Sequence, residues 1–323
     1  MNRVNHLAEA DRGTSDWPRT ISIVGAAGHV GASLAARLAT SGRGARLHLQ
    51  DLRANVLESH RIDLADTQAL LGVDSPELRL GAPAAEEADL VILAASRPET
   101  PDGDRRDFLT GNLEMLDGLA GQIAAALGET GLLLVLTNPV DIVCDWLCRY
   151  RGFDPARVIG YSLNDSARFR RAVAEELAVP VSRVRATVGG EHGVDQVPLF
   201  SSVRVDGAPV EVSEAGRARI LEDLGGWFPR WSALRSGRSS SWASGYGAAE
   251  FLARLYGGET TVASVSTVGV AGLPASFLSL PVRLESGAPR AAPSGITPEE
   301  WELLERAGHS IRRQSEGIGP DLA

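Results

Sequence analysis

The chain has 323 residues, a formal net charge of −9 at pH 7 and 44% apolar residues, which suits two globular lobes and leaves no apolar run long enough to cross a bilayer. The negative charge, together with the lack of a basic stripe interleaved with aromatic residues, excludes a typical nucleic-acid-binding protein. All 32 residues of the lysine-plus-arginine count are arginine, so a mechanism that needs a lysine amine, such as a Schiff base, is excluded.

The first 19 residues carry no targeting pattern. They have neither the cationic start and apolar core of an export signal nor an Arg-rich amphipathic face. We therefore expect residues 1–19 to be a disordered tail and the protein to be cytoplasmic.

A glycine-rich turn follows the first predicted strand. Residues 21–25 (ISIVG) form an apolar strand pattern that runs into GAAGHVG and then into a helical segment. The first glycine permits a tight turn, the second permits close approach of a pyrophosphate, and the third permits the helix to pack near the strand. The N-terminus of the helix then faces the phosphates. The predicted nucleotide-binding turn comprises Gly25, Gly28, His29, Val30 and Gly31.

An acidic residue argues against an ordinary strand-to-helix turn at this place. The next strand pattern, ARLHLQ, ends in Asp51, about 20 residues further on, where a carboxylate accepts hydrogen bonds from the ribose hydroxyls of a dinucleotide. A carboxylate at this position also repels a 2′-phosphate, which favours NAD over NADP. Arg53 lies nearby, so the strictness of this preference stays open.

Two further apolar strands are predicted in the first half of the chain. They cover residues 88–96 (ADLVILAAS) and the start of residues 132–141 (LLLVLTNPVD). Small residues end the first of these strands, which permits a cofactor to lie across its carboxyl end. Pro139 is expected to fix the turn after the second strand.

An acid, a cation and an imidazole follow in NDSARFR at 164–170 and GGEHG at 189–193. Reduction of a 2-oxo acid needs a proton donor beside the carbonyl oxygen, which His192 supplies if Asp165 holds its imidazolium protonated and oriented. It also needs a planar cation for the substrate carboxylate, for which Arg168 is the candidate. Asp165 and Arg168 stand three apart on a predicted amphipathic helix and so share one side of it. The alternative is a surface ion pair, which is common and weak.

The C-terminal part of the chain is predicted to have a structural role. Residues 261–272 and 277–287 have the pattern of antiparallel strands. Thr297 and Glu300 predict a capping box at the start of a closing helix. No other histidine has a comparable context and no histidine or carboxylate cluster has metal-ligand spacing, so we predict no metal site.

The chain resembles the lactate/malate dehydrogenase family of NAD-dependent 2-hydroxy acid dehydrogenases. The features that carry the resemblance are, in chain order, GAAGHVG, Asp51, TNPVD, NDSARFR, GGEHG and FLSLPV. The resemblance runs from about residue 20 to about residue 315. It implies an α/β fold in which a Rossmann doubly wound parallel sheet (residues 20–158, NAD-binding) precedes an α+β substrate domain (residues 159–323, catalytic). It also implies an L-2-hydroxy acid as substrate and a homo-dimer or homo-tetramer.

The resemblance implies further site residues. Residues 96–112 match a mobile lid over the active site, and counting back from Asn112 places Arg105 at the lid arginine that stabilises the polarised carbonyl. Arg106 substitutes if the register slips by one, and a solvated charge run is the alternative. Asn138 matches an asparagine that positions substrate and nicotinamide. Asn112 matches a family asparagine near the cofactor, or else caps a helix.

One position departs from the family. Glu99 stands where malate enzymes have arginine and lactate enzymes have glutamine, at the position that reads the substrate side chain. Glutamate there would repel the distal carboxylate of oxaloacetate. Either Arg97 replaces the missing cation, or Glu99 accepts a polar or cationic substrate side chain. Ser240, which matches a pocket-wall position, offers a small hydroxyl and favours the second alternative.

We therefore predict an NAD-dependent dehydrogenase acting on a small 2-hydroxy or 2-oxo acid, without nucleic-acid or membrane partners. The first rival is a malate dehydrogenase that uses Arg97 as its carboxylate clamp. The second is a non-catalytic NAD-binding scaffold or sensor. Intact Asp165, Arg168 and His192 argue against a scaffold, which has no need of all three.

Overall fold

The computed structural model describes residues 17–82, 88–97, 105–128, 130–237 and 240–319, except for the side chains of residues 105–107. Within these ranges the strands form a continuous mixed sheet that runs through both halves of the chain. No described helix has the length and apolar character that crossing a membrane requires.

The first half of the sheet is parallel. Its strands are β1 (Thr20–Val24), β2 (Arg46–Gln50), β3 (Glu77–Leu80), β4 (Leu90–Leu93), β5 (Leu132–Val135) and β6 (Val158–Gly160). In space they lie in the order β3-β2-β1-β4-β5-β6, and each neighbouring pair is parallel. The order reverses between β1 and β4. In sheets of this kind, ligands bind outside the carboxyl ends of the strands at such a switch point.

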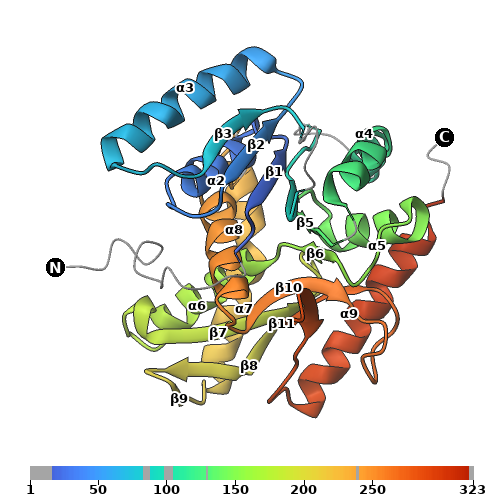
Figure 1. Ribbon diagram of the computed structural model, residues 1–323. Coiled ribbons are helices and arrows are strands. Elements are labelled where there is room, and N and C mark those ends of the chain that lie inside the picture. Colours follow the sequence, from blue (N-terminus) through green and yellow to red (C-terminus); the bar gives the residue numbers. More distant parts are fainter. Residues whose placement is uncertain (1–16, 83–87, 98–104, 129, 238–239, 320–323) are drawn as a thin grey trace.

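Helices cover both faces of the parallel strands (Figure 1). One face packs against α2 (His29–Ala39), α3 (Ala54–Leu71) and α8 (Ser241–Tyr256), and the other against α4 (Arg105–Leu127) and α5 (Val140–Arg151). Successive strand side chains point to opposite faces. Ile92 therefore joins the core under α2 and α8, whereas Val91 and Leu93 join the core under α4 and α5. The predicted doubly wound sheet is confirmed, and its two buried faces explain why its central strands are unbroken apolar runs.

The second half of the sheet is antiparallel. Its strands are β7 (Val184–Gly190), β8 (Gln196–Val205), β9 (Ala208–Pro209), β10 (Thr261–Ser266), β11 (Phe277–Glu285) and β12 (Ala288–Ala291). β10 pairs with β6 and continues the sheet through β11, β7, β8 and β9, while β12 pairs with β11. The helices of this half besides α8 are α6 (Leu163–Glu176), η1 (Val181–Arg183), α7 (Glu214–Ala233) and α9 (Pro298–Glu316). The predicted α+β second part is confirmed.

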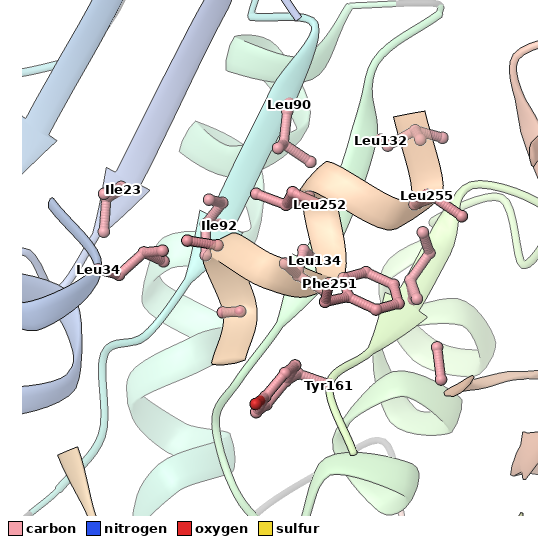
Figure 2. Close-up of a cluster of buried hydrophobic side chains, with 14 of the residues drawn as sticks. Ile23, Leu34, Leu90, Ile92, Leu132, Leu134, Tyr161, Phe251, Leu252 and Leu255 are labelled. Atoms are coloured by element: carbon pink, nitrogen blue, oxygen red, sulfur yellow. The ribbon is translucent and has the colours of Figure 1, made fainter. Parts of the chain in front are cut away.

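Helix α8 comes from the second half of the chain and completes the core of the first. Phe251 and Leu252 of α8 belong to the same cluster of buried side chains as Ile92 of β4 (Figure 2). Gly245 lets α8 approach α2 so closely that a methyl group there would lie 2.8 Å from the backbone nitrogen of Leu34. The two halves therefore share one hydrophobic core, and this fixes their relative position.

The predicted elements are found in the structure, but they do not account for all of its strands: β3, β6, β7, β8, β9 and β12 were not predicted. The strand patterns that begin at residues 21, 88, 132, 261 and 277 all contain strands, and the Thr297 capping box at the start of α9 is confirmed. β3, with the sequence ELRL, has no counterpart in the prediction. It is an edge strand that is mostly exposed, so it lacks the apolar alternation that marks a strand.

The predicted tail falls largely on residues 1–16, which lie outside the described part of the chain. Trp17 belongs to the same predicted tail but is half-buried, and its ring packs edge-on against Tyr256 with 5.7 Å between centroids. The guanidinium of Arg43 lies over the Trp17 ring. At Trp17 the chain is thus already packed on the core.

We expect Phe251→Ala to lower the free energy of unfolding by about 3–5 kcal/mol. The substitution removes a fully buried ring that packs edge-on against Tyr161 and leaves a cavity in the shared core. Urea unfolding followed by circular dichroism measures the change. Leu70→Ala on α3, where the residue is 86% exposed, is the control and should change stability by less than about 0.5 kcal/mol. Equal stability of the two variants would contradict the packing of α8 described above.

Candidate active site

His192 and Asp165 form a mostly buried pair. His192 lies in the turn between β7 and β8, and Asp165 lies in the first turn of α6. Nδ1 of His192 is 2.6 Å from Oδ2 of Asp165, and the two side chains are 16% and 7% exposed. Burial by itself lowers the pKa of His192, but the charge and hydrogen bond of Asp165, assisted by Asp141, outweigh it and raise the pKa above 6.5. The other ring nitrogen, Nε2, is therefore the atom that can hold and release a proton.

Arg168 shares the carboxylate of Asp165. Its Nη1 donates to Asp165 Oδ1 at 2.9 Å, so the two carboxylate oxygens are divided between Arg168 and His192. Among the described residues, neither Nε nor Nη2 of Arg168 has a hydrogen-bond acceptor. That edge of the guanidinium has the planar, two-donor geometry that suits a carboxylate.

Asp141 ties the turn that carries His192 to the first half of the chain. This carboxylate, in the first turn of α5, accepts the backbone N–H of His192 at 2.7 Å through Oδ2 and the hydroxyl of Ser264 on β10 through Oδ1. Burial is the main cause that raises the pKa of Asp141 to about 6. Three elements that are distant in sequence thus meet at one side chain.

The glycines of GGEHG explain why the chain can turn at this place. Gly190 ends β7 with φ at +84°, a conformation that side chains other than glycine rarely adopt. A methyl group on Gly190 would also lie 2.6 Å from the backbone oxygen of Asp195. Glycine therefore allows the sharp reversal from β7 into β8 that carries His192 toward α6.

Asn112 joins the ends of β4 and β5. It is fully buried inside α4, so the alternative that it caps a helix is wrong. Its Oδ1 accepts the backbone N–H of Arg97 at 2.7 Å, and its Nδ2 donates to the backbone oxygen of Asn138 at 3.0 Å. Both of these neighbours are exposed. Asn112 thus fixes the backbone from which Arg97 and Asn138 project at the carboxyl ends of the strands.

The glycine turn after β1 lies at the switch point of the sheet. Gly25 has φ at +90°, and a methyl group there would lie 2.4 Å from the backbone nitrogen of Ala95, just after β4. A methyl group on Gly31 would meet the backbone oxygen of Gly25 at 2.2 Å, so α2 packs directly on the turn. At Gly28, by contrast, the oxygen of Gly25 is the one described atom within 4 Å. That side of the turn is open to a ligand.

The N-terminus of α2 suits a phosphate. Gly28 caps the helix without a side-chain hydrogen bond, and the first turn, which begins at His29, contains no acidic residue. The backbone N–H groups and the positive end of the helix dipole are therefore not neutralised by a side chain. The residues predicted from the sequence thus fit the pyrophosphate of a dinucleotide.

Asp51 supplies a negative charge beside this turn. It follows β2 directly, and its carboxylate accepts the backbone N–H of Ala27 at 3.1 Å and the Arg53 side chain at 3.2 Å. Burial by itself raises the pKa of Asp51, but these hydrogen bonds outweigh it and the pKa lies below its ordinary value. An ionised carboxylate at the end of β2 fits the ribose hydroxyls of NAD and disfavours a 2′-phosphate.

Two profiles of one protein family match the chain. The profile described as "lactate/malate dehydrogenase, NAD binding domain" matches residues 19–160, and the one described as "lactate/malate dehydrogenase, alpha/beta C-terminal domain" matches residues 163–224. The chain belongs to the lactate/malate dehydrogenase family. Its cofactor is NAD, and it is a 2-hydroxy acid oxidoreductase, as the sequence predicted.

Full-length relatives carry both names of this family. A malate dehydrogenase of Thermomicrobium roseum is 31% identical over 304 residues, covering 91% of this chain and 96% of the relative. L-lactate dehydrogenase A of Hordeum vulgare is 30% identical over 318 residues, covering 92% and 85%. Among solved structures, the malate dehydrogenase from Aeropyrum pernix superposes with a TM-score of 0.83 at 25% identity, covering 94% of this chain and 99% of that one. The two names occur at similar identity, so they do not separate lactate from malate.

The predicted lid of this dehydrogenase falls largely outside the described residues. Glu99 lies within residues 98–104, and although α4 begins at Arg105, the side chains of Arg105 and Arg106 are not described. Ser240 is described: it is the half-buried N-cap of α8. No hydrogen bond among the described residues joins it to His192 or Arg168.

Two site residues were missed by the sequence predictions. Asp141 directly follows TNPV, and a charge within the apolar start of a helix was the available signal for a buried, functional carboxylate. Trp227 lies over Arg168, with 3.5 Å between Cζ and the ring centroid. Its contact depends on the packing of α7 against α6, which no local pattern encodes.

We expect Asp165→Asn to lower the pKa of His192. Burial disfavours the charged imidazolium, and the negative charge of Asp165, which outweighs this effect in the native protein, is removed. Titration of the His192 ring signals by NMR measures the shift. In the native protein a raised pKa means that ionised His192 contributes stability below about pH 6.5, and that this contribution is lost as the pH rises through the raised value. Asp195→Asn, an exposed neighbour in the same turn, is the control and should leave the titration in place. A His192 titration that does not move in Asp165→Asn would rule out the pairing.

Proposed function

We propose that the chain interconverts an L-2-hydroxy acid and its 2-oxo acid, with a polar or cationic side chain on the substrate. The observation that carries the proposal is the carboxylate of Asp165, which holds both His192 and Arg168. A proton donor and a carboxylate-binding cation are thereby oriented from one point. These are the two groups that reduction of a 2-oxo acid requires besides a hydride.

Each residue has a defined task in the proposed reaction. NADH, when bound, supplies a hydride to the carbonyl carbon. His192 gives its Nε2 proton to the carbonyl oxygen and becomes neutral, while Asp165 holds the ring. Arg168 binds the C1 carboxylate through Nε and Nη2, and Arg105 stabilises the negative charge that develops on the oxygen. In the reverse direction His192 accepts the hydroxyl proton and NAD⁺, when bound, would accept the hydride, so electrons and protons balance.

The cofactor contacts are assigned to the turn and the strand ends. Gly25 and Gly31 shape the turn, the backbone of Gly28, His29 and Val30 faces the pyrophosphate, and Asp51 accepts the ribose hydroxyls. At the carboxyl ends of β4 and β5, Asn112 and Asn138 position the nicotinamide and the substrate. The division at residues 158 and 159, a homo-dimer or homo-tetramer and a cytoplasmic location stay predictions.

Glu99 and Ser240 are proposed to read the substrate side chain. A carboxylate at position 99 attracts a cationic or hydrogen-bond-donating group and repels a second carboxylate. The small hydroxyl of Ser240 leaves room for such a group. This assignment rests on the sequence, since Glu99 lies outside the described residues.

A malate dehydrogenase is the second candidate, and one observation favours it. Arg97 is exposed at the carboxyl end of β4, its backbone is held by Asn112, and its side chain has no ion-pair partner among the described residues. A guanidinium in that place suits the distal carboxylate of oxaloacetate.

A panel of 2-oxo acids with NADH separates the two candidates. We expect substrates with polar or cationic side chains to give a higher kcat/KM than oxaloacetate or pyruvate. We also expect Glu99→Gln to lower kcat/KM for the preferred substrate by about 10- to 100-fold, because a charge-assisted hydrogen bond is lost. Absorbance of NADH follows the reaction. If the native protein clearly preferred oxaloacetate and Glu99→Gln had no effect, this proposal would be wrong and the chain would be a malate dehydrogenase that uses Arg97.

His192→Asn should lower kcat by about 10²- to 10⁴-fold, the range that general acid catalysis contributes. The circular dichroism spectrum and the binding of NADH should stay unchanged, which separates loss of chemistry from loss of fold. His309→Asn, an exposed histidine of α9, is the matched control and should keep the native rate. A His192→Asn protein with native kcat would remove His192 from the proposed mechanism. If the native protein reduced none of the 2-oxo acids in the panel, a non-catalytic scaffold would be favoured instead.

A further inference from the structure

The face of the Arg168 guanidinium is covered by an indole ring. Cζ of Arg168 lies 3.5 Å above the centroid of the Trp227 ring, which is van der Waals contact between the guanidinium and the ring. Trp227 is itself half-buried and stacks on Trp231, with 5.5 Å between centroids and 11° between planes. The cation thus lies on a layer of two aromatic rings from α7.

The packing of α7 against α6 places this ring, because contacts recur along both helices in one antiparallel register. One turn beyond the stack, Arg171 of α6 pairs with Asp223 of α7 at 2.8 Å. Further along, Glu176 of α6 pairs with Arg219 of α7 at 2.6 Å. As the α6 positions rise, the α7 positions fall. The contact of Trp227 with Arg168 is therefore one step of a helix interface and not an isolated encounter.

The hydrogen bond to Asp165 alone does not fix the plane of the guanidinium. It holds Nη1 at 2.9 Å, but a guanidinium on its flexible stem can rotate about a single hydrogen bond. Bidentate binding of a carboxylate requires the acid and the guanidinium to be coplanar. A flat ring on one face supplies the missing constraint, and it also excludes water from that face.

We propose that Trp227 is a positioning residue for the 2-oxo acid: its indole fixes the plane of Arg168 so that the Nε and Nη2 edge meets the C1 carboxylate. The inference rests on the proposed role of Arg168. The carboxylate is bound in the same way before and during the reaction. The contribution of Trp227 is therefore uniform binding, which changes KM rather than kcat.

The test is the steady-state kinetics of Trp227→Leu with NADH and the best 2-oxo acid of the panel. We expect KM for the 2-oxo acid to rise about 5- to 30-fold, the cost of ordering one flexible arginine side chain when the substrate binds. We expect kcat and the KM for NADH to change by less than about 3-fold. Trp227→Phe keeps a ring over the cation and should restore most of the lost affinity. A merely structural role would lower the active fraction, and so kcat, and would leave KM unchanged.

Three further changes serve as controls for this test. Phe228→Leu changes the next residue of α7, which is 60% exposed, and should keep native kinetics. Trp227→Met keeps an apolar side chain without a ring, and it carries the same prediction if Trp227→Leu does not fold. In an Arg168→Lys background the effect of Trp227→Leu on KM should shrink to less than about 3-fold, because an ammonium has no plane to fix.

Native KM in a folded Trp227→Leu or Trp227→Met protein, measured beside an active wild type, would overturn the role of Trp227 alone. The same effect of Trp227→Leu with lysine and with arginine at position 168 would overturn it as well. If none of the 2-oxo acids tested supported NADH oxidation by the wild type, the proposed function on which this role rests would be overturned instead.

Discussion

The arrangement of the site depends on one buried carboxylate. Asp165 has two oxygens, and the structure gives one to His192 and the other to Arg168. A mostly buried carboxylate is stable when it is paired and hydrogen-bonded. His192 and Arg168 each hydrogen-bond one of its oxygens, and the same contacts orient the two side chains. The proposed proton donor and the proposed carboxylate-binding group therefore cannot be positioned independently. Any movement of the Asp165 turn shifts both.

The first half of the chain holds this unit from the other side. Asp141 accepts the backbone N–H of His192, so a residue at the start of α5 fixes the turn between β7 and β8. Asn112 fixes the backbone after β4 and β5 on the same edge of the sheet. These hydrogen bonds of Asp141 and Asn112 act together with the core under α8. They hold the carboxyl ends of the parallel strands close to the turn between β7 and β8. A small substrate held by Arg168 and a nicotinamide held at the strand ends would then meet.

The sequence predicted those parts of the molecule that have a local cause. Buried strands are unbroken apolar runs, the Thr297 cap needs two residues at a fixed spacing, and Asp165 and Arg168 share a side because a helix repeats at that interval. The exposed edge strand β3 was missed because it lacks the apolar pattern. Asp141 and Trp227 were missed because their partners lie on other elements, at a distance in sequence that only the folded chain closes. Position 99 was identified by alignment with the family, and its side chain lies outside the described residues.

In the proposed function, the charges at the site decide which substrate it takes. Asp165 and Asp141 carry negative charge opposite His192 and Arg168, so above about pH 6, where Asp141 ionises, the four groups balance when His192 is protonated. In the proposed reaction, one substrate carboxylate is met by the free edge of Arg168. A second carboxylate needs a further cation, since two like charges about 4 Å apart at an effective dielectric constant near 20 repel by about 4 kcal/mol, nearly a thousandfold in binding. Arg97 and Glu99 stand two residues apart with opposite sign. Whichever of them faces the substrate sets its class: Arg97 admits a dicarboxylate, whereas Glu99 excludes one and selects a polar or cationic side chain.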